Sequence, residues 1–246
     1  MERSLFDKLA SLDERHWMVY AKKAFTAPYL GSRGGKRILD AGCGTGPMLR
    51  FFSGWGEVVG LDASAYALEH ARRSSAGAAT LVEADVSKIP FPDRHFDVVT
   101  LYDVLYHRAV KDDENVLKEC SRVLKDGGRL VIVDSAFKFL RTSYDDEAHV
   151  ARRYTLAEMK EKLAKSGLKV KKASYIFFFV FPAVAALRFI HNALKVKVRE
   201  SDHMFKVNAL TNSLMRSLIW VESLAVRAAG LPFGTSLFCV GVKEER

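Results

Sequence analysis

Ile38-Leu-Asp-Ala-Gly-Cys-Gly-Thr-Gly46 is the stretch of the chain that decides the fold. It begins as an apolar run typical of a buried strand. Pro47 follows it and suits the first turn of a helix, because that turn needs no proline N–H. The three glycines lack side chains, so backbone N–H groups can approach a bound molecule closely. A glycine loop between a strand and a helix predicts a small-molecule site at the carboxyl ends of a parallel sheet.

Short apolar runs and helical segments alternate along the rest of the chain, which is typical of a parallel sheet with helices on both faces. We therefore predict an α/β fold: a doubly wound, Rossmann-like seven-stranded sheet with helices on both faces and a helical insertion before the last strand. The predicted strands are 38–39, 58–61, 80–82, 98–101, 130–133, 168–176 and 237–242, with a turn at 126–128 before the fifth. The predicted helices are 48–52, 65–73, 113–124, one from Thr155 to Gly167 that opens with a capping box, and 208–229.

One domain is expected over residues 1–246, because no linker separates a second one. Residues 1–30 are predicted to form an N-terminal helical cap, with leucines at helical spacing. Residues 177–230 are predicted to form a helical lid insertion that opens with an apolar run. That run is shorter than the ~20 apolar residues of a membrane-spanning helix and contains Pro182. Its phenylalanines are expected either to line an acceptor pocket or to bury against the second helix of the insertion.

The composition is that of an ordinary globular domain, with 49% hydrophobic and 27% charged residues among 246. Cys43, Cys120 and Cys239 form no CxxC pair, so we expect neither a disulfide framework nor a metal site. The charged N-terminus is followed by no apolar signal region. These features predict a cytoplasmic protein.

The net charge of +9 is concentrated in the C-terminal third of the chain. Such an excess either keeps a protein soluble or marks contact with an anionic surface. An apolar segment with basic neighbours can rest on a membrane. Peripheral membrane contact through residues 169–206 is therefore the alternative to a purely cytoplasmic location.

Three carboxylates that follow predicted strands indicate what the glycine loop binds. Asp40 would repel a pyrophosphate and suits a ligand that carries an ammonium group. The third glycine also comes one residue early for the dinucleotide pattern G-x-G-x-x-G. Asp62 can accept hydrogen bonds from both hydroxyls of a ribose. Asp85 can accept one from an adenine amino group, with Val86 donating from its backbone. An NAD-type oxidoreductase is an alternative function for a glycine loop of this kind, and these features argue against it.

From about Arg37 to Asp134 the chain resembles the class I S-adenosylmethionine-dependent methyltransferases, in particular the small-molecule subset of types 11 and 12. The segments that carry the resemblance are 39–46, 60–64, 84–86, 89–93, 96–99 and 123–128. The resemblance implies S-adenosylmethionine as cofactor and S-adenosylhomocysteine as product. The loop would hold the methionine end, Asp62 the ribose and Asp85 the adenine. The implied cofactor-binding residues are Asp40, Gly42, Cys43, Gly44, Gly46, Asp62, Ala63, Asp85, Val86 and Tyr102.

Methyl transfer from a sulfonium is an in-line displacement, so the protein mainly aligns the acceptor and excludes water. A general base is needed only if the acceptor must lose a proton, and His107 and His149 are the candidates. The segment Asp13-Glu-Arg-His-Trp17 resembles a helix that closes over the cofactor in part of the family, although Trp17 can equally be a core anchor. The residues expected to contact substrate are Trp17, Tyr20, Tyr106, Arg152 and Arg153, the arginines as clamps for an anionic group.

The motifs of nucleic-acid methylation are missing, since Tyr102-Asp-Val-Leu105 stands where a Pro-Pro-aromatic tetrad would be and no Pro-Cys pair is present. The sequence thus predicts a methyltransferase that acts on a small or lipid-like metabolite and has no nucleic-acid partner. Two alternatives stay open: a non-catalytic S-adenosylmethionine-binding module and a lipid methyltransferase at the membrane surface. The sequence does not predict the oligomeric state.

Overall fold

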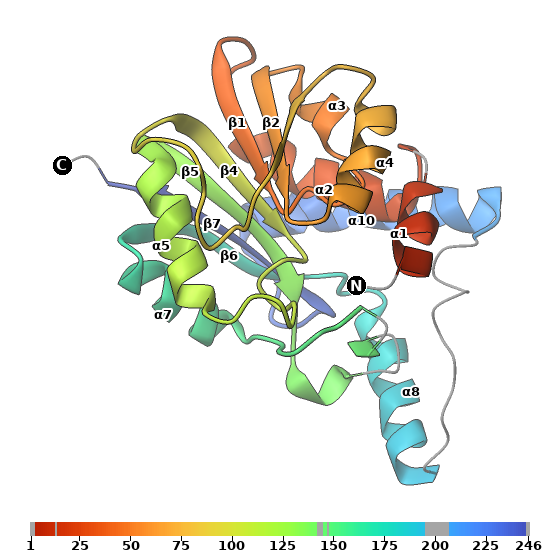
Figure 1. Ribbon diagram of the computed structural model, residues 1–246. Helices are drawn as coiled ribbons and strands as arrows, with labels where there is room; N and C mark the ends of the chain where they lie inside the picture. Colours follow the sequence, from red (N-terminus) through yellow and green to blue (C-terminus); the bar gives the residue numbers. More distant parts are fainter. Residues whose placement is uncertain (1–2, 13, 142–144, 147, 195–206, 245–246) are drawn as a thin grey trace.

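A seven-stranded sheet with the order β3-β2-β1-β4-β5-β7-β6 forms the centre of the molecule (Figure 1). It belongs to a computed structural model that describes residues 3–12, 14–141, 145–146, 148–194 and 207–244. All neighbouring strands up to β5 run parallel, and β7 is antiparallel to both of its neighbours. The strands are β1 (Lys36–Ala41), β2 (Gly56–Asp62), β3 (Thr80–Glu83), β4 (Phe96–Tyr102), β5 (Leu124–Ser135), β6 (Leu168–Ile176) and β7 (Ser236–Lys243).

Helices cover both faces of the sheet, which confirms the predicted fold class. On one face α5 and α7 bury their apolar sides in one core cluster, and on the other α2, α4 and α10 contribute to a second. The helices are α1 (Arg3–Ala10), α2 (Trp17–Thr26), η1 (Ala27–Tyr29), α3 (Leu49–Phe52), α4 (Ala65–Ser75), α5 (Asp113–Val123), η2 (Lys138–Leu140), α7 (Leu156–Lys165), α8 (Phe181–Leu194) and α10 (Ala209–Ala228).

Side-chain caps fix where several helices begin. Thr155 accepts the N–H of Glu158, and the Glu158 carboxylate accepts the N–H of Thr155, so the predicted capping box is present. The Ser64 side chain caps α4 by accepting the N–H of Ala67, and the Asp112 side chain caps α5 by accepting the N–H of Asn115. These caps explain why the predicted helix starts agree with the observed ones.

The predicted turn at 126–128 lies inside β5 rather than before it. Strand pairing steps from Phe96 opposite Leu124 to Val98 opposite Arg129, so the intervening residues of β5 are looped out of the ladder. Gly127 has φ +75°, a left-handed conformation that glycine adopts without strain. The turn chemistry was predicted correctly, but a strand residue already precedes it.

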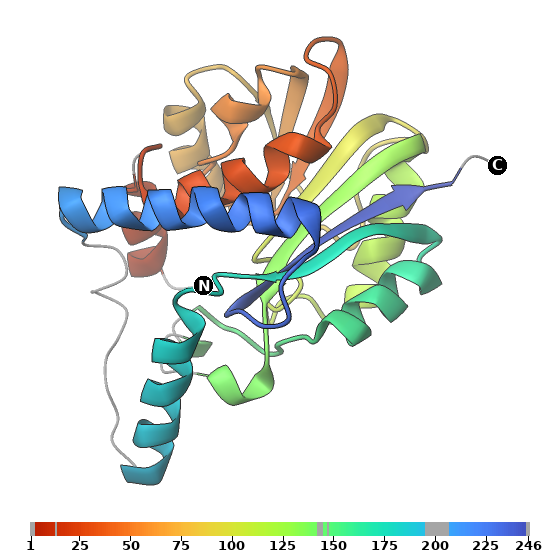
Figure 2. The ribbon, with the colours of Figure 1, turned by 180° about the vertical axis from the view of Figure 1, so that it is seen from behind.

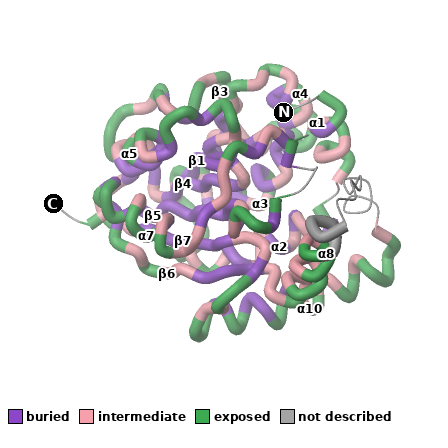
Figure 3. The backbone as a smooth tube through the Cα atoms, turned by 90° about the horizontal axis from the view of Figure 1, so that it is seen from below, coloured by how far each residue is buried: buried purple, intermediate pink, exposed green. Residues whose placement is uncertain are grey.

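The insertion between β6 and β7 contains α8 and α10, which lie at a steep angle to each other (Figure 2). α10 packs along α2, whereas α8 extends away from the sheet. In Figure 3 the central strands are mostly buried, while α8 and α10 are largely exposed. Within the described residues, no helix combines the length and hydropathy needed to cross a membrane. Lys195, Lys197, Arg199 and Lys206 of the predicted membrane-contact segment 169–206 lie outside the described residues.

Candidate active site

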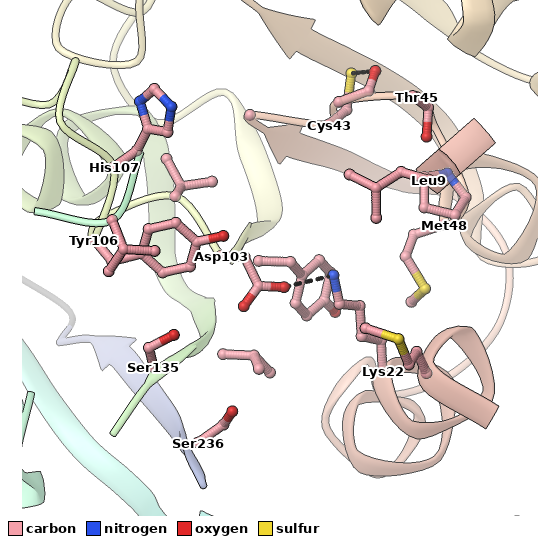
Figure 4. Close-up of a pocket in the computed structure, with 18 of the residues that line it drawn as sticks. Leu9, Lys22, Cys43, Thr45, Met48, Asp103, Tyr106, His107, Ser135 and Ser236 are labelled. Atoms are coloured by element: carbon pink, nitrogen blue, oxygen red, sulfur yellow. Dashed lines mark hydrogen bonds and ion pairs between the residues drawn. The ribbon is translucent and has the colours of Figure 1, made fainter. Parts of the chain in front are cut away.

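A cavity of about 830 Å³ lies at the carboxyl ends of the parallel strands. The glycine loop and the ends of β2 and β4 form one side of it, and α1, α2 and the start of α8 close over it. Figure 4 shows Lys22 and Met48 on one side of the space and Tyr106 and His107 on the other. The cavity therefore joins the predicted cofactor loop to a second region, farther along the strand ends.

The glycine loop depends on Gly42. Its φ is +76°, and a Cβ built there would lie 2.5 Å from Cγ2 of Val104. Gly42, Cys43 and Gly44 line the cavity. Gly46 does not line it, because it packs against Ala71 of α4, where a Cβ would lie 3.0 Å away. Its role is therefore in the packing of the loop, and a direct cofactor contact stays a prediction.

Asp40 lies at the methionine end of the predicted cofactor site and is almost completely buried. The Thr100 hydroxyl donates a 2.6 Å hydrogen bond to its Oδ1. Burial raises the pKa of Asp40 to about 6, against the opposing effects of Thr100 and of the Lys22 ammonium. Because a buried carboxylate is costly without a cation, this site favours a cationic ligand.

Asp62 and Asp85 line the cavity beyond the loop. Asp62 accepts the Gly44 N–H at 2.8 Å and the Ser64 N–H at 2.9 Å, while burial raises the pKa of its carboxyl. Asp85 accepts the Ser87 N–H at 2.7 Å and lies beside Val86. Asp40, Asp62 and Asp85 follow one another along the strand ends, in the order expected for the methionine, ribose and adenine parts of one ligand.

Lys22 of α2 contributes a cation that the sequence did not assign to the site. Its Nζ lies 2.8 Å from a carboxylate oxygen of Asp103 (Figure 4). The same Nζ lies 5.4 Å from the centre of the Tyr102 ring. Asp103 has φ +59°, a conformation that non-glycine residues rarely adopt and that is common at functional sites. The hydroxyl groups of Tyr102 and Thr26 are 2.7 Å apart, which ties α2 to the end of β4. The N-terminal cap is thus fastened to the end of β4 by an ion pair and a hydrogen bond.

These residues fit S-adenosylmethionine. Its ammonium and sulfonium are cations, its amino-acid carboxylate is an anion, and its ribose and adenine donate hydrogen bonds. Asp40 suits the ammonium, Lys22 suits the carboxylate, and Asp62 and Asp85 suit the hydroxyl and amino groups. A dinucleotide would instead place its pyrophosphate against a loop flanked by carboxylates. Among the described residues, no group of three His, Cys, Asp or Glu side chains is close enough to hold a metal ion.

His107 lines the second region of the cavity, and the His149 ring lies next to the His107 ring. The two rings are 5.8 Å apart, and His149 is not part of the cavity wall. Burial, together with His149 and Arg108, lowers the pKa of His107 to about 4. Its Nδ1 accepts the Ala109 N–H at 3.1 Å, so the neutral ring carries its proton on Nε2. In this arrangement His107 offers the cavity a donor rather than a base.

The predicted substrate residues divide into two groups. Trp17, Tyr106 and Arg153 line the cavity, whereas Tyr20 and Arg152 do not. The Tyr20 ring lies under the Arg216 guanidinium at 4.7 Å. Arg152 donates to the Val110 carbonyl at 2.9 Å. The Arg152 guanidinium also lies 3.6 Å from a carboxylate oxygen of Asp113. Both side chains are thus engaged by other residues of the chain rather than presented to the cavity.

Arg153 forms a bidentate pair with Asp145, with both N–O distances at 2.7 Å. Asp145 is only 1% exposed, so this pair is a fixed part of the wall. The sequence predicted Arg153 as a clamp for an anionic substrate group. The fork that would make such a clamp is occupied by Asp145, a partner that sequence spacing did not reveal.

Apolar side chains complete the second region. Phe177 meets the Trp17 ring edge-on, with the ring centres 5.8 Å apart. Val180, just before α8, and Val184, on α8, continue the wall. The insertion was expected either to line an acceptor pocket or to bury against its second helix, and Phe177 and Val180 line the cavity. Phe178 and Phe181 instead stack on Phe233, in the turn before β7, rather than along α10.

Comparison with known proteins agrees with this geometry. Residues 39–132 match the family model described as "Methyltransferase domain". A ubiquinone/menaquinone biosynthesis C-methyltransferase from Stutzerimonas stutzeri is 39% identical over 150 residues, which are 57% of this chain and 57% of that protein. The chain therefore matches little more than half the length of this curated relative.

Solved structures share the fold at lower identity. A Haloferax volcanii complex of the Trm112 methyltransferase activator with a methyltransferase contains a chain with a TM-score of 0.64, 24% identity and coverage of 99% of this chain and 98% of that one. The [4+2]-cyclase SpnF has a TM-score of 0.61 and 19% identity, covering 93% and 82% of the two chains. At these identities the likeness concerns the fold. Residues 39–132 are thus similar to a methyltransferase domain, and the chain has the fold of the class I S-adenosylmethionine-dependent methyltransferases.

Proposed function

We propose that this protein transfers a methyl group from S-adenosylmethionine to an apolar, lipid-like small molecule. The observation that carries the proposal is the continuity of one cavity. Its first region presents Asp40, Asp62 and Asp85, and its second is walled by Trp17 and the start of α8. A donor site and an acceptor site that share one space can bring two reactants into line.

The acceptor side of the cavity is mainly apolar, with a few polar groups. Phe177, Val180 and Val184 form its wall, and the hydroxyl groups of Ser135 and Ser236 face the same space (Figure 4). A molecule with an oxygen-bearing ring and an apolar tail fits this distribution. The curated relatives are C-methyltransferases of ubiquinone and menaquinone biosynthesis, which supports a quinone-type acceptor for this chain too.

The bound cofactor supplies a methyl group already activated by the positive sulfonium. The chain's own residues then have three tasks: to hold the cofactor, to align the acceptor and to exclude water. Lys22, paired with Asp103, closes the cap over the methionine end. His107 donates toward an acceptor oxygen through Nε2. Deprotonation of the acceptor by His107 would require its Nδ1 to leave Ala109 or its ring to change tautomer.

The second candidate is a module that binds S-adenosylmethionine without transferring its methyl group. The fold alone does not require methyl transfer, since SpnF, which shares it, is named a [4+2]-cyclase. To distinguish the two, we would titrate the full chain with S-adenosylmethionine and NAD by calorimetry. We would then incubate it with S-adenosylmethionine and a membrane lipid extract. Formation of S-adenosylhomocysteine is expected. Cofactor binding without turnover on any acceptor pool would favour the second candidate, and binding of NAD alone would refute both.

Cofactor affinity is expected to fall in acid. The ammonium of the cofactor requires an ionised Asp40, whose pKa is raised to about 6. Protons compete below that value, so the dissociation constant should rise about tenfold for each pH unit below 6. Calorimetric titrations between pH 5 and pH 8 would measure this change, because that range extends about one pH unit below the pKa of Asp40 and about two above it. Asp40→Asn should bind weakly with a flat profile; a wild-type profile that is equally flat would contradict the assignment.

Lys22 should set the position of that profile. Its ammonium lowers the pKa of Asp40, so Lys22→Met is expected to move the midpoint of the pH dependence upward. Lys23→Met is the matched control, because Lys23 pairs with Glu14 at 3.1 Å instead. Equal midpoints for Lys22→Met and Lys23→Met would show that Lys22 does not act on the methionine end.

A further inference from the structure

Exposed apolar side chains are confined to one part of the molecule. Within the described residues, the large apolar side chains that are strongly exposed all come from η2 or from residues 179–233. The rest of the described chain, including all other helices, contributes none. They are Phe139, Phe179, Leu187, Phe189, Leu210, Leu214, Trp220, Val221, Leu224 and Phe233.

On α10 these side chains form a continuous stripe. Leu210, Leu214, Val221 and Leu224 are spaced so that they share one side of the helix. The opposite side, with Ile219 and Val226, is buried where α10 packs along α2. A helix of 20 residues is about 30 Å long. The stripe is thus an extended apolar surface that the described chain leaves uncovered.

α8 has two different sides. Val184 and Arg188, one turn apart, line the cavity. Leu187 is 49% exposed and Phe189 is 78% exposed. At the base of the helix, Phe181 stacks on Phe233 and meets Phe139, whose ring is half exposed. The helix that walls the acceptor region therefore also presents apolar side chains to the outside.

The charge around these helices favours an anionic occupant. The described parts of this stretch, 169–194 and 207–233, contain six lysines and arginines and one acid, which is +5 of the chain's net charge of +9. That acid, Glu222, is buried and accepts the N–H of Phe178, so it does not face outward. A second copy of the chain would bring the same positive charge against this surface, whereas an anionic bilayer would neutralise it.

We infer that the outer sides of α8 and α10, with the exposed phenylalanines at the base of α8, dock on the surface of an anionic lipid bilayer. We call this surface the docking face; it comprises the ten side chains named above. Apolar side chains enter the interface and the surrounding basic residues contact lipid headgroups. The acceptor then moves between bilayer and cavity along the inner side of α8, a step that rests on the proposed function.

Vesicle flotation tests this with the full chain. Vesicles of equal parts phosphatidylglycerol and phosphatidylcholine should bind the protein at low salt, less so at high salt, and pure phosphatidylcholine vesicles should bind it weakly. The double variant Leu187→Glu with Phe189→Glu should partition at least about tenfold less. Trp220→Glu with Leu224→Glu is a second, independent variant on α10. Lys118→Glu on α5 changes the charge by the same amount on an exposed position of another helix and should bind as the wild type does.

Each outcome is decisive when S-adenosylmethionine binding is measured on the same samples. No flotation of the wild type at low salt, or equal flotation of the wild type and both double variants, would overturn the docking face. So would light scattering that shows a lipid-free dimer which the α10 variant converts to a monomer, because the face would then bind a second copy. Vesicle binding without S-adenosylmethionine binding would leave the docking face standing and refute the proposed function.

Discussion

Replacing Asp62 by alanine is expected to weaken the binding of S-adenosylmethionine about a hundredfold. The carboxylate lies in the cavity at the end of β2, where it can accept both ribose hydroxyls. Hydrogen bonds to a charged group contribute about 1.5 kcal/mol each, so the loss of two costs about 3 kcal/mol. Calorimetric titration of the variant measures the change directly.

Glu83→Ala is the matched control for this substitution. Glu83 ends the neighbouring strand β3, is exposed and does not line the cavity. Its removal should leave the affinity within about twofold of the wild type, as for most surface substitutions. Circular dichroism should show both variants folded. If Asp62→Ala bound the cofactor as tightly as Glu83→Ala, the ribose assignment would be wrong.

Gly42→Ala is expected to destabilise the protein by about 2 to 4 kcal/mol. The left-handed backbone costs an alanine about 1 to 2 kcal/mol, and the new methyl group would lie 2.5 Å from Cγ2 of Val104. Val104 is β-branched and buried, so it cannot turn aside without disturbing its neighbours. Urea denaturation measures the loss as a lower midpoint.

Gly44→Ala separates the two causes. Gly44 has φ +55°, but nothing lies within 4 Å of the position its Cβ would take. This variant should lose only the backbone part, about 1 to 2 kcal/mol. Combining Gly42→Ala with Val104→Ala should recover some of the stability that Gly42→Ala alone loses. Equal losses for Gly42→Ala and Gly44→Ala would mean that Val104 yields more easily than its packing suggests.

The cofactor half of the site could be read from the sequence because its residues follow strands in chain order. Asp40, Asp62 and Asp85 each come after an apolar run, and parallel strands bring their carboxyl ends to one edge. The predicted strand 168–176 matches the observed β6 for a similar reason, since the glycine that stops the preceding helix, Gly167, is a local signal.

The acceptor half could not be read in this way, because it is made by pairs that are distant in the chain. Lys22 meets Asp103 across the cap, and α8 brings Val184 and Arg188 to strands that precede it by many residues. No local pattern specifies such contacts. Arg153 shows the same limit over a shorter distance, since its pairing with Asp145 depends on how the intervening chain folds back.

Helical periodicity predicted α10 but did not show which side of the helix packs against the rest of the protein. Apolar residues recur at helical spacing at 210, 214, 218, 221 and 224, and most of these side chains are exposed. The side that packs on α2 carries Ile219, Glu222, Ser223 and Val226, which is a more polar set. An apolar stripe marks a surface that will be buried against something, and the pattern is the same whether that partner is the core or another surface.

The place of β7 in the sheet has a consequence for how the molecule assembles. β6 pairs only with β7, and β7 follows it in the chain after both helices of the insertion. During synthesis β6 therefore has no strand partner until β7 has been made and pairs between β6 and β5. The half of the sheet with the predicted nucleoside site can form first, while the wall of the acceptor region is completed only when β7 is in place.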